Sequence, residues 1–234
     1  MTKMKVYKEN INELTEDEYI LVRKDSFGAS DVASLFGIGF QTLEQVIAQK
    51  QKKFVTEEER EIGRKPNVRK GKDLEPLILQ KTMEALNVTL VKPNHMFEIL
   101  PGLTVNFDAI CADDTCPYEL KYVTTFGKKD WTLNVNLPFI HHYMPPDEFY
   151  RNDIQEHIKY MAAIAGIPVY YYTQIQTQLI GTNKKMGYVC ALFEHDWTLR
   201  VYRIYRDPYF EIELRKIVPQ YAPRLMETPK EESY

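Results

Sequence analysis

The chain has 234 residues, of which 44% are hydrophobic and 27% are charged, and its formal net charge is −3. This length and balance are typical of a globular protein with one large core, and the sequence has no internal repeat or low-complexity tract. No apolar run approaches the ~18 residues of a membrane span, and no N-terminal segment has the form of a signal peptide. We therefore expect a cytoplasmic protein that makes no contact with membranes.

Three cysteines, Cys111, Cys116 and Cys190, limit the chemistry further. Their number is odd and their spacing matches no zinc signature, while an iron–sulfur cluster normally takes four ligands. Reduced thiols are the simplest interpretation, because disulfides are rare in the cytoplasm. A structural zinc or iron–sulfur protein is thereby disfavoured.

The charge is unevenly distributed along the chain. Residues 49–72 hold nine lysines and arginines against four glutamates, a local net charge of +5. A negative total argues against a nucleic-acid binder, but phosphates respond to charges within a Debye length of ~10 Å. This stretch is either an ordinary solvated surface or a contact for a DNA backbone. His141, His142 and His157 do not form a recognisable metal-binding motif.

The first half of the chain alternates helical patterns with strand patterns. A helix is predicted to open at Ser30 as its N-cap, and a second helix is expected over residues 42–51. Charged residues 52–70 are interpreted as a mobile loop, followed by the clearest helix over residues 71–86. Strands are predicted over residues 90–92, 96–100, 104–112 and 118–123, the last two joined as a hairpin by the turn at residues 113–115.

The second half continues with an irregular connection over residues 124–148. A helix over residues 148–165 should end at Gly166, which suits a C′ position. Three strands are predicted over residues 169–180 and 186–205, then a helix over residues 209–217. We interpret residues 1–218 as one domain and residues 219–234 as a polar, poorly ordered tail. The expected fold class is α/β or α+β, with a mixed central sheet flanked by helices.

One constellation of polar residues stands within the predicted hairpin. Asp108 interrupts the apolar stretch 105–110, although aspartate is depleted inside strands. Glu119 and Lys121 share one face of the next strand, because side chains two residues apart point the same way. If the two strands pair, Asp108 approaches Glu119. Two adjacent carboxylates favour a hard divalent ion such as Mg²⁺, and the lysine can orient or deprotonate a water and neutralise a phosphoryl transition state.

Such a short pattern also occurs by chance, so the segments around it carry more weight. In order, they resemble the lambda-exonuclease or YqaJ-like branch of the PD-(D/E)xK nuclease superfamily over roughly residues 20–175. The resemblance rests on five segments, which are residues 23–32 (RKDSFGASDV), 71–76 (GKDLEP), 106–109 (NFDA), 119–121 (ELK) and 160–166 (YMAAIAG).

The resemblance implies a role for each matching residue. Glu75, Asp108 and Glu119 would bind the metal together with the backbone carbonyl of Leu120, and Lys121 would be the catalytic lysine. Arg23 and Ser30 would hold the 5′ phosphate of a DNA end, in agreement with the affinity of arginine and helix N-termini for phosphate. The family has a glutamine on the second helix, and here either Gln155 or Glu156 would take that role.

The resemblance also implies an activity. We expect a Mg²⁺-dependent deoxyribonuclease, with Mn²⁺ as an alternative ion, that degrades linear double-stranded DNA as an exonuclease in the 5′→3′ direction during phage-type homologous recombination. Its partners would be DNA ends, a single-strand annealing protein and further copies of the chain in a homo-oligomer, in a bacterial or prophage setting. Two alternatives stay open, an endonuclease or structure-specific nuclease on the same core and a DNA-end-binding module that does not cleave.

Overall fold

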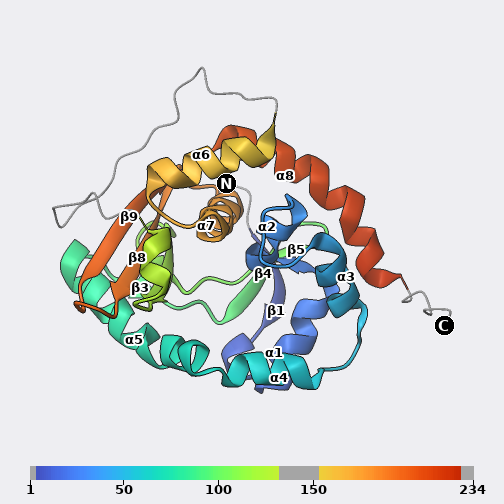
Figure 1. Cartoon of the computed structure of the whole chain (residues 1–234), viewed down its shortest axis with the longest axis horizontal. Helices are drawn as coiled ribbons and strands as arrows, with labels where there is room; N and C mark the ends of the chain where they lie inside the picture. Colours follow the sequence, from blue (N-terminus) through green and yellow to red (C-terminus); the bar gives the residue numbers. More distant parts are fainter. Residues whose placement is uncertain (1–3, 132–152, 228–234) are drawn as a thin grey trace.

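The strands form two mixed sheets with helices packed around and between them. The computed structural model describes residues 4–131 and 153–227. One sheet has the order β1-β4-β5-β2 and the other the order β3-β6-β7-β8-β9. The α/β class with mixed sheets and flanking helices is confirmed, but the strands are divided between two sheets and do not form one central sheet (Figure 1).

The first sheet contains β1 (Lys5–Glu9), β2 (Phe27–Gly28), β4 (His95–Leu100) and β5 (Leu103–Val105). The second contains β3 (Leu90–Val91), β6 (Ala109–Cys111), β7 (Pro117–Val123), β8 (Met186–Phe193) and β9 (Leu199–Tyr205).

The strand predicted over residues 104–112 is therefore two strands. β5 pairs with β4 and β2, whereas β6 pairs with β3 and β7, so the chain changes sheets between Val105 and Ala109. The β6–β7 hairpin forms as expected, with Ala109 opposite Tyr118. The change of sheets places Asp108 at a bend between the two layers and not inside a strand.

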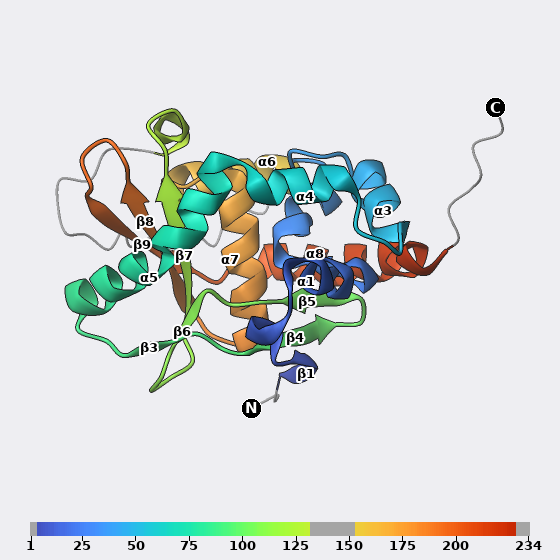
Figure 2. The ribbon, with the colours of Figure 1, turned by 90° about the horizontal axis from the view of Figure 1, so that it is seen from below.

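The segment predicted as a strand over residues 169–180 is instead a helix, α7 (Val169–Thr182). It contacts β4 and β5 on one side and β7 and β8 on the other, and Figures 1 and 2 show it between the two sheets. A helix buried from several sides needs no polar face, so its periodicity is weak, and its tyrosines and β-branched residues favour strand locally. Burial between two sheets overrides that preference.

The N-terminal helices are α1 (Glu16–Val22), α2 (Val32–Leu35), α3 (Leu43–Gln51), α4 (Glu57–Arg64) and α5 (Pro66–Leu86). The interpretation of residues 52–70 as a loop is wrong. Thr56 and Glu59 form a capping box that starts α4, and Pro66 occupies the first turn of α5, where its missing N–H costs nothing.

The C-terminal helices are α6 (Ile154–Ala165) and α8 (Pro208–Tyr221). Asp153 caps α6, so this helix begins later than the predicted residue 148, and Gly166 ends it with a φ of 76° as expected. The predicted tail is ordered as far as residue 227, because α8 continues to Tyr221 and Leu225 is fully buried. Residues 228–234 and His141 and His142 lie outside the described residues.

Five 3₁₀ segments complete the described elements: η1 (Ile11–Glu13), η2 (Arg23–Asp25), η3 (Ala29–Asp31), η4 (Gly127–Asp130) and η5 (Ala222–Met226). The three cysteines are free and buried, and burial raises the pKa of the Cys190 thiol to about 12. In the described part of the chain, no helix is long and apolar enough to cross a membrane.

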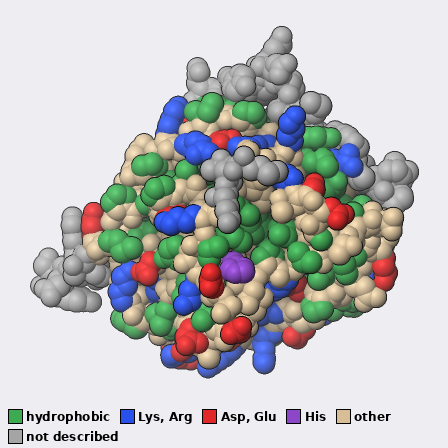
Figure 3. Space-filling view, turned by 180° about the vertical axis from the view of Figure 1, so that it is seen from behind, with side chains coloured by type: hydrophobic (Ala, Val, Ile, Leu, Met, Phe, Trp, Pro, Cys, Tyr) green, Lys and Arg blue, Asp and Glu red, His purple; other side chains and the backbone are tan. Residues whose placement is uncertain are grey.

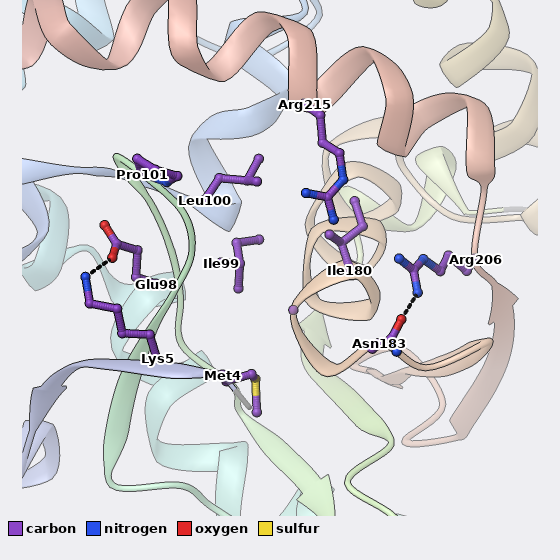
Figure 4. A pocket seen from close by; sticks show the side chains of 11 residues that line it. Met4, Lys5, Glu98, Ile99, Leu100, Pro101, Ile180, Asn183, Arg206 and Arg215 are labelled. Carbon is purple, nitrogen blue, oxygen red and sulfur yellow. Dashed lines mark hydrogen bonds and ion pairs between the residues drawn. The ribbon is translucent and has the colours of Figure 1, made fainter. Parts of the chain in front are cut away.

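A cavity of about 320 Å³ lies where the C-terminal end of α7 meets β4 and α8. Arg206 and Arg215 line it, and Figure 4 shows Arg206 bonded to Asn183 at the end of α7. Both arginines also pair with Glu211, at 2.6 and 2.8 Å. Their charges are thus satisfied within the protein, and we interpret this cavity as a junction between the layers.

Two aspartates that begin helices give a matched test of the core. Asp207 is 1% exposed and caps α8. Its carboxylate accepts a hydrogen bond from the Tyr172 hydroxyl, its backbone N–H donates to Oε1 of Gln176, and Nε2 of His157 lies 2.7 Å from its Oδ2. We expect Asp207→Ala to lower the free energy of unfolding by about 3 kcal/mol, because the buried side chains of Tyr172 and His157 lose a hydrogen-bond partner. Asp153→Ala removes only an exposed cap and should cost about 1 kcal/mol in urea unfolding. Equal losses would contradict this ranking.

Candidate active site

The carboxylate of Asp108 bridges the bend between the sheets and the strand β7. Its Oδ2 accepts a hydrogen bond from the backbone N–H of Leu120 at 2.9 Å. The hairpin register that pairs Ala109 with Tyr118 brings Asp108 beside Glu119. The structure therefore brings together Asp108, Glu119 and Lys121, the three residues that the sequence pattern singled out.

Glu119 is a fully buried carboxylate held from two sides. On β7 it is 0% exposed, and the side-chain amides of Gln174 and Gln178 donate to its two oxygens at 2.5 and 2.6 Å. Burial, followed by the charge of Asp108, raises the pKa of Glu119 to about 8, although Lys121 and Gln178 act in the opposite direction. A carboxylate so perturbed inside a polar cluster is typical of a functional site.

The ammonium group of Lys121 stands between the two carboxylates. Its Nζ forms an ion pair with Glu119 and lies 3.5 Å from Oδ2 of Asp108 and 5.2 Å from the centre of the Tyr171 ring. Burial alone would lower the pKa of Lys121, but the charges of Glu119 and Asp108 raise it above its ordinary value. Lys121 is therefore a cation at neutral pH, which favours charge neutralisation over a role as a base.

Glu75, on α5, lies beside the same centre. It lines a cavity of about 480 Å³ together with Asp108, Leu120 and Lys121. Its carboxylate forms an ion pair with Lys92, however, and does not contact Asp108. Within residues 4–131 and 153–227, no three acidic, histidine or cysteine side chains are grouped closely enough to hold a metal ion.

The donor set nevertheless fits a hard divalent cation. Asp108 and Glu119 are carboxylates, and Leu120 supplies a backbone carbonyl, all of them oxygen donors of the kind that Mg²⁺ prefers. Two buried acceptors beside them, Oδ1 of Asn106 and Oε1 of Gln178, have no hydrogen-bond partner among the described residues. The water shell that Mg²⁺ retains would satisfy such surplus acceptors.

Arg23 and Ser30 meet in a second cavity, of about 240 Å³. Arg23 donates a hydrogen bond to the Ser30 hydroxyl at 2.9 Å. Asp108 and Lys121 also line this cavity, so these two residues form the wall that it shares with the cavity of Glu75. Ser30 is not a helix N-cap as predicted, because it lies in η3 and the four-residue α2 begins after Asp31. Side chains, and not a helix terminus, make this pocket.

A buried lysine fastens the segment that carries Arg23 and Ser30. The Nζ of Lys50 donates to the backbone carbonyls of Arg23 and Ser26, at 2.8 Å each, and lies 2.8 Å from Oδ2 of Asp31. The same carboxylate accepts the N–H of Gly28 at 2.7 Å. The start and the end of the segment are thereby fixed relative to each other.

Gln155 and Glu156 lie on α6 outside this centre. Both are exposed, Glu156 pairs with Lys159 at 2.8 Å, and neither lines the two cavities. The amides beside Glu119 come from Gln174 and Gln178, which sequence reasoning missed. Gln178 is fully buried and Gln174 is partly buried. Their spacing was a signal in the sequence, since residues four apart lie on one side of a helix. Assigning the segment as a strand concealed it.

Replacement of Lys121 by methionine tests the charge balance without an activity assay. Lys121→Met leaves two carboxylates facing each other without a cation, so we expect unfolding to become easier by about 3 kcal/mol in a chelating buffer. Millimolar Ca²⁺ or Mg²⁺ should restore much of this loss in a thermal-shift measurement, and should stabilise the variant more than the parent. Lys24→Met is the control, because Lys24 is a buried lysine that pairs with Glu59 and lines neither cavity of the centre, so divalent ions should not stabilise this variant more than the parent. If divalent ions do not raise the melting temperature of Lys121→Met more than that of the parent, the expected cation site is wrong.

The chain was compared with known families and structures. It matches the model of the YqaJ-like viral recombinase domain over residues 18–185. No match was found among curated proteins. The fold is similar to the crystal structure of LHK-Exo in complex with dAMP, with a TM-score of 0.60 at 15% identity over 89% of this chain and 91% of that one. It is also similar to an alkaline exonuclease (LHK-Exo) from Laribacter hongkongensis, with a TM-score of 0.57 at 17% identity and the same coverage. Because the matched domain spans most of its length, the chain belongs to the YqaJ-like viral recombinase domain family.

Proposed function

We propose that this protein is a divalent-metal-dependent exonuclease that hydrolyses the phosphodiester bonds of linear double-stranded DNA. One observation carries the proposal. Asp108 and Lys121 form the wall between two cavities, one containing Glu75 and the other containing Arg23 and Ser30. A DNA end whose terminal phosphate lies with Arg23 and Ser30 would then present a neighbouring phosphodiester to the acidic centre.

Each side chain around the two cavities has a separate role in the proposed reaction. Lys121, kept protonated by its carboxylate neighbours, donates hydrogen bonds and neutralises the negative charge that develops as the P–O bond breaks. Gln174 and Gln178 fix the orientation of Glu119. Arg23 offers a guanidinium to the terminal phosphate, and the Ser30 hydroxyl to which it is bonded adds a second polar group.

Asp108, Glu119, the Leu120 carbonyl and Glu75 would hold Mg²⁺, with Mn²⁺ as an alternative. The bound ion supplies an activated water and charge neutralisation. Glu75 would exchange its ion pair with Lys92 for this role, and the Lys121 ammonium would move from its position between the two carboxylates.

The finer features of the activity follow the family resemblance. A pocket for a terminal phosphate favours 5′→3′ degradation, and the complex of LHK-Exo with dAMP agrees with a mononucleotide product. We further propose that the protein acts as a homo-oligomer on DNA ends, in recombination of the phage type, beside a single-strand annealing protein.

Alanine substitution of the centre tests the reaction. With Mg²⁺ and end-labelled linear duplex, Glu119→Ala and Lys121→Ala should each reduce cleavage by at least ~100-fold, because each removes charge stabilisation of the transition state. Closed circular duplex should resist the parent protein. Cleavage of circles would favour an endonuclease, wild-type-like digestion by both variants would refute the site, and DNA binding without any cleavage would favour a binding module.

The phosphate pocket is tested separately with ends that carry or lack a 5′ phosphate. Arg23→Ala should abolish most of the preference of the parent for phosphorylated ends while it preserves slow cleavage of hydroxyl ends. Arg224→Ala is a matched control, because Arg224 pairs with the exposed Glu44 and lines neither cavity. An unchanged preference in Arg23→Ala would remove this residue from the pocket.

A further inference from the structure

Two exposed aromatic rings flank the cavity of the acidic centre. Phe126 is 90% exposed, and its near neighbours Thr124 and Gly127 line the cavity that contains Asp108 and Lys121. Trp197 is 50% exposed at the turn between β8 and β9, whereas Trp131, the other tryptophan, is 4% exposed. In Figure 2 the end of β7 and this turn lie on the same side of the molecule. We call Phe126 and Trp197 the aromatic rim.

A single carboxylate fastens the two parts of the rim together. Glu194, at the base of the turn, accepts the N–H of Thr125 at 3.1 Å and pairs with Lys70 at 2.7 Å. It also accepts the hydroxyl of Tyr122, which lines the cavity. The hydrogen bond from Lys70, followed by that from Tyr122, lowers the pKa of Glu194 to about 2, so this contact persists at physiological pH. The backbone segments that carry the two rings are therefore held together beside the cavity.

The backbone of Trp197 is held in an unfavourable conformation. Its φ is 55°, a left-handed value that is rare for a bulky side chain. Oδ1 of Asp196 supports the turn by accepting the N–H of Thr198 at 3.1 Å. Asparagine suits such a turn better than tryptophan does, so the large ring is kept at the surface in spite of a local cost. Strain of this kind is found at functional positions.

Basic side chains accompany the rim. Lys70 lies 5.0 Å from the ring centre of Tyr122 and 6.0 Å from that of Trp197, and Arg69 beside it is exposed. Lys128 and Lys129 follow Phe126 after Gly127. The acidic Asp196 is paired with His195 at 2.9 Å. On the rear face, by contrast, basic, acidic and hydrophobic side chains are interspersed over the described surface (Figure 3).

We propose that the aromatic rim binds single-stranded DNA by stacking bases on Trp197 and Phe126, and so guides the uncut strand away from the acidic centre. Exposed rings beside lysines are the features by which proteins bind single strands without sequence preference. A duplex keeps its bases stacked on each other and offers no free base faces to these rings. This inference rests on the proposed nuclease function, because it assigns the occupant of the rim as the strand that cleavage leaves behind.

The fluorescence of Trp197 allows a direct test. In Ca²⁺, without Mg²⁺, titration of the full-length protein with an oligothymidine should quench tryptophan emission, and quenching should weaken as salt increases. In Trp197→Phe the remaining emission comes from Trp131, which is 4% exposed but lines the cavity, so most of the quenching should be lost although the oligonucleotide still binds. Quenching that persists in this variant, or that duplex DNA produces as strongly as the single strand, would overturn the proposal.

Affinity measurements separate stacking from folding. Trp197→Asn removes the ring while it suits the positive φ, so this variant should fold at least as well as the parent. We expect it to bind the oligothymidine between about 5-fold and about 150-fold more weakly, and Phe126→Ala to show a loss in the same range. Phe54→Ala is the control, because Phe54 is 62% exposed and lines no part of the cavity. Unchanged affinity in both rim variants would overturn the proposal.

The rim and the nuclease function fail in different ways. If the parent protein shows quenching and rim-dependent binding but no Mg²⁺-dependent cleavage, the proposed function is wrong and the single-strand surface stands. If cleavage depends on Glu119 while the rim variants bind the oligothymidine as the parent does, the function stands and the rim does not bind single strands.

Discussion

The buried contact among Asp108, Glu119 and Lys121 is the constraint on which the arrangement around it depends. Two adjacent carboxylates repel each other, and the burial of Glu119 penalises its charged form. The ammonium of Lys121 and the amides of Gln174 and Gln178 make this arrangement tolerable. Lys121 comes from the same strand as Glu119, whereas both amides come from α7, so the contacts of Glu119 depend on the position of α7 between the sheets.

The same contact explains how the two cavities are related. Asp108 lies where the chain passes from one sheet to the other, and therefore belongs to the surroundings of both. The segment with Arg23 and Ser30 packs on the first sheet through β2, whereas Glu75 comes from α5, which packs on the second sheet through β7. A centre at the boundary can receive groups from both layers, and this is why Asp108 and Lys121 line both cavities.

Sequence reasoning predicted the centre well and its surroundings less well, for physical reasons. A polar residue inside an apolar strand pattern is a local signal, and Asp108 with the Glu119–Lys121 pair was found from it. Gln155 and Glu156 lie on α6 and line neither cavity, whereas the amides that contact Glu119 come from α7, whose tyrosines and β-branched residues resemble a strand. Tertiary burial decided that segment, and no local window contains this information. The division into two sheets depends likewise on strand partners that are distant in sequence.

The composition of α7 affects how readily the unfolded chain aggregates. Residues 167–183 contain no charged side chain and are rich in aromatic and β-branched residues. In the native protein the two sheets cover this segment, but before they close around it the chain exposes a sequence with a strong tendency to form intermolecular strands. The helix that orients Glu119 is therefore also a segment prone to aggregation before the protein folds, and its burial protects the protein as well as building the centre.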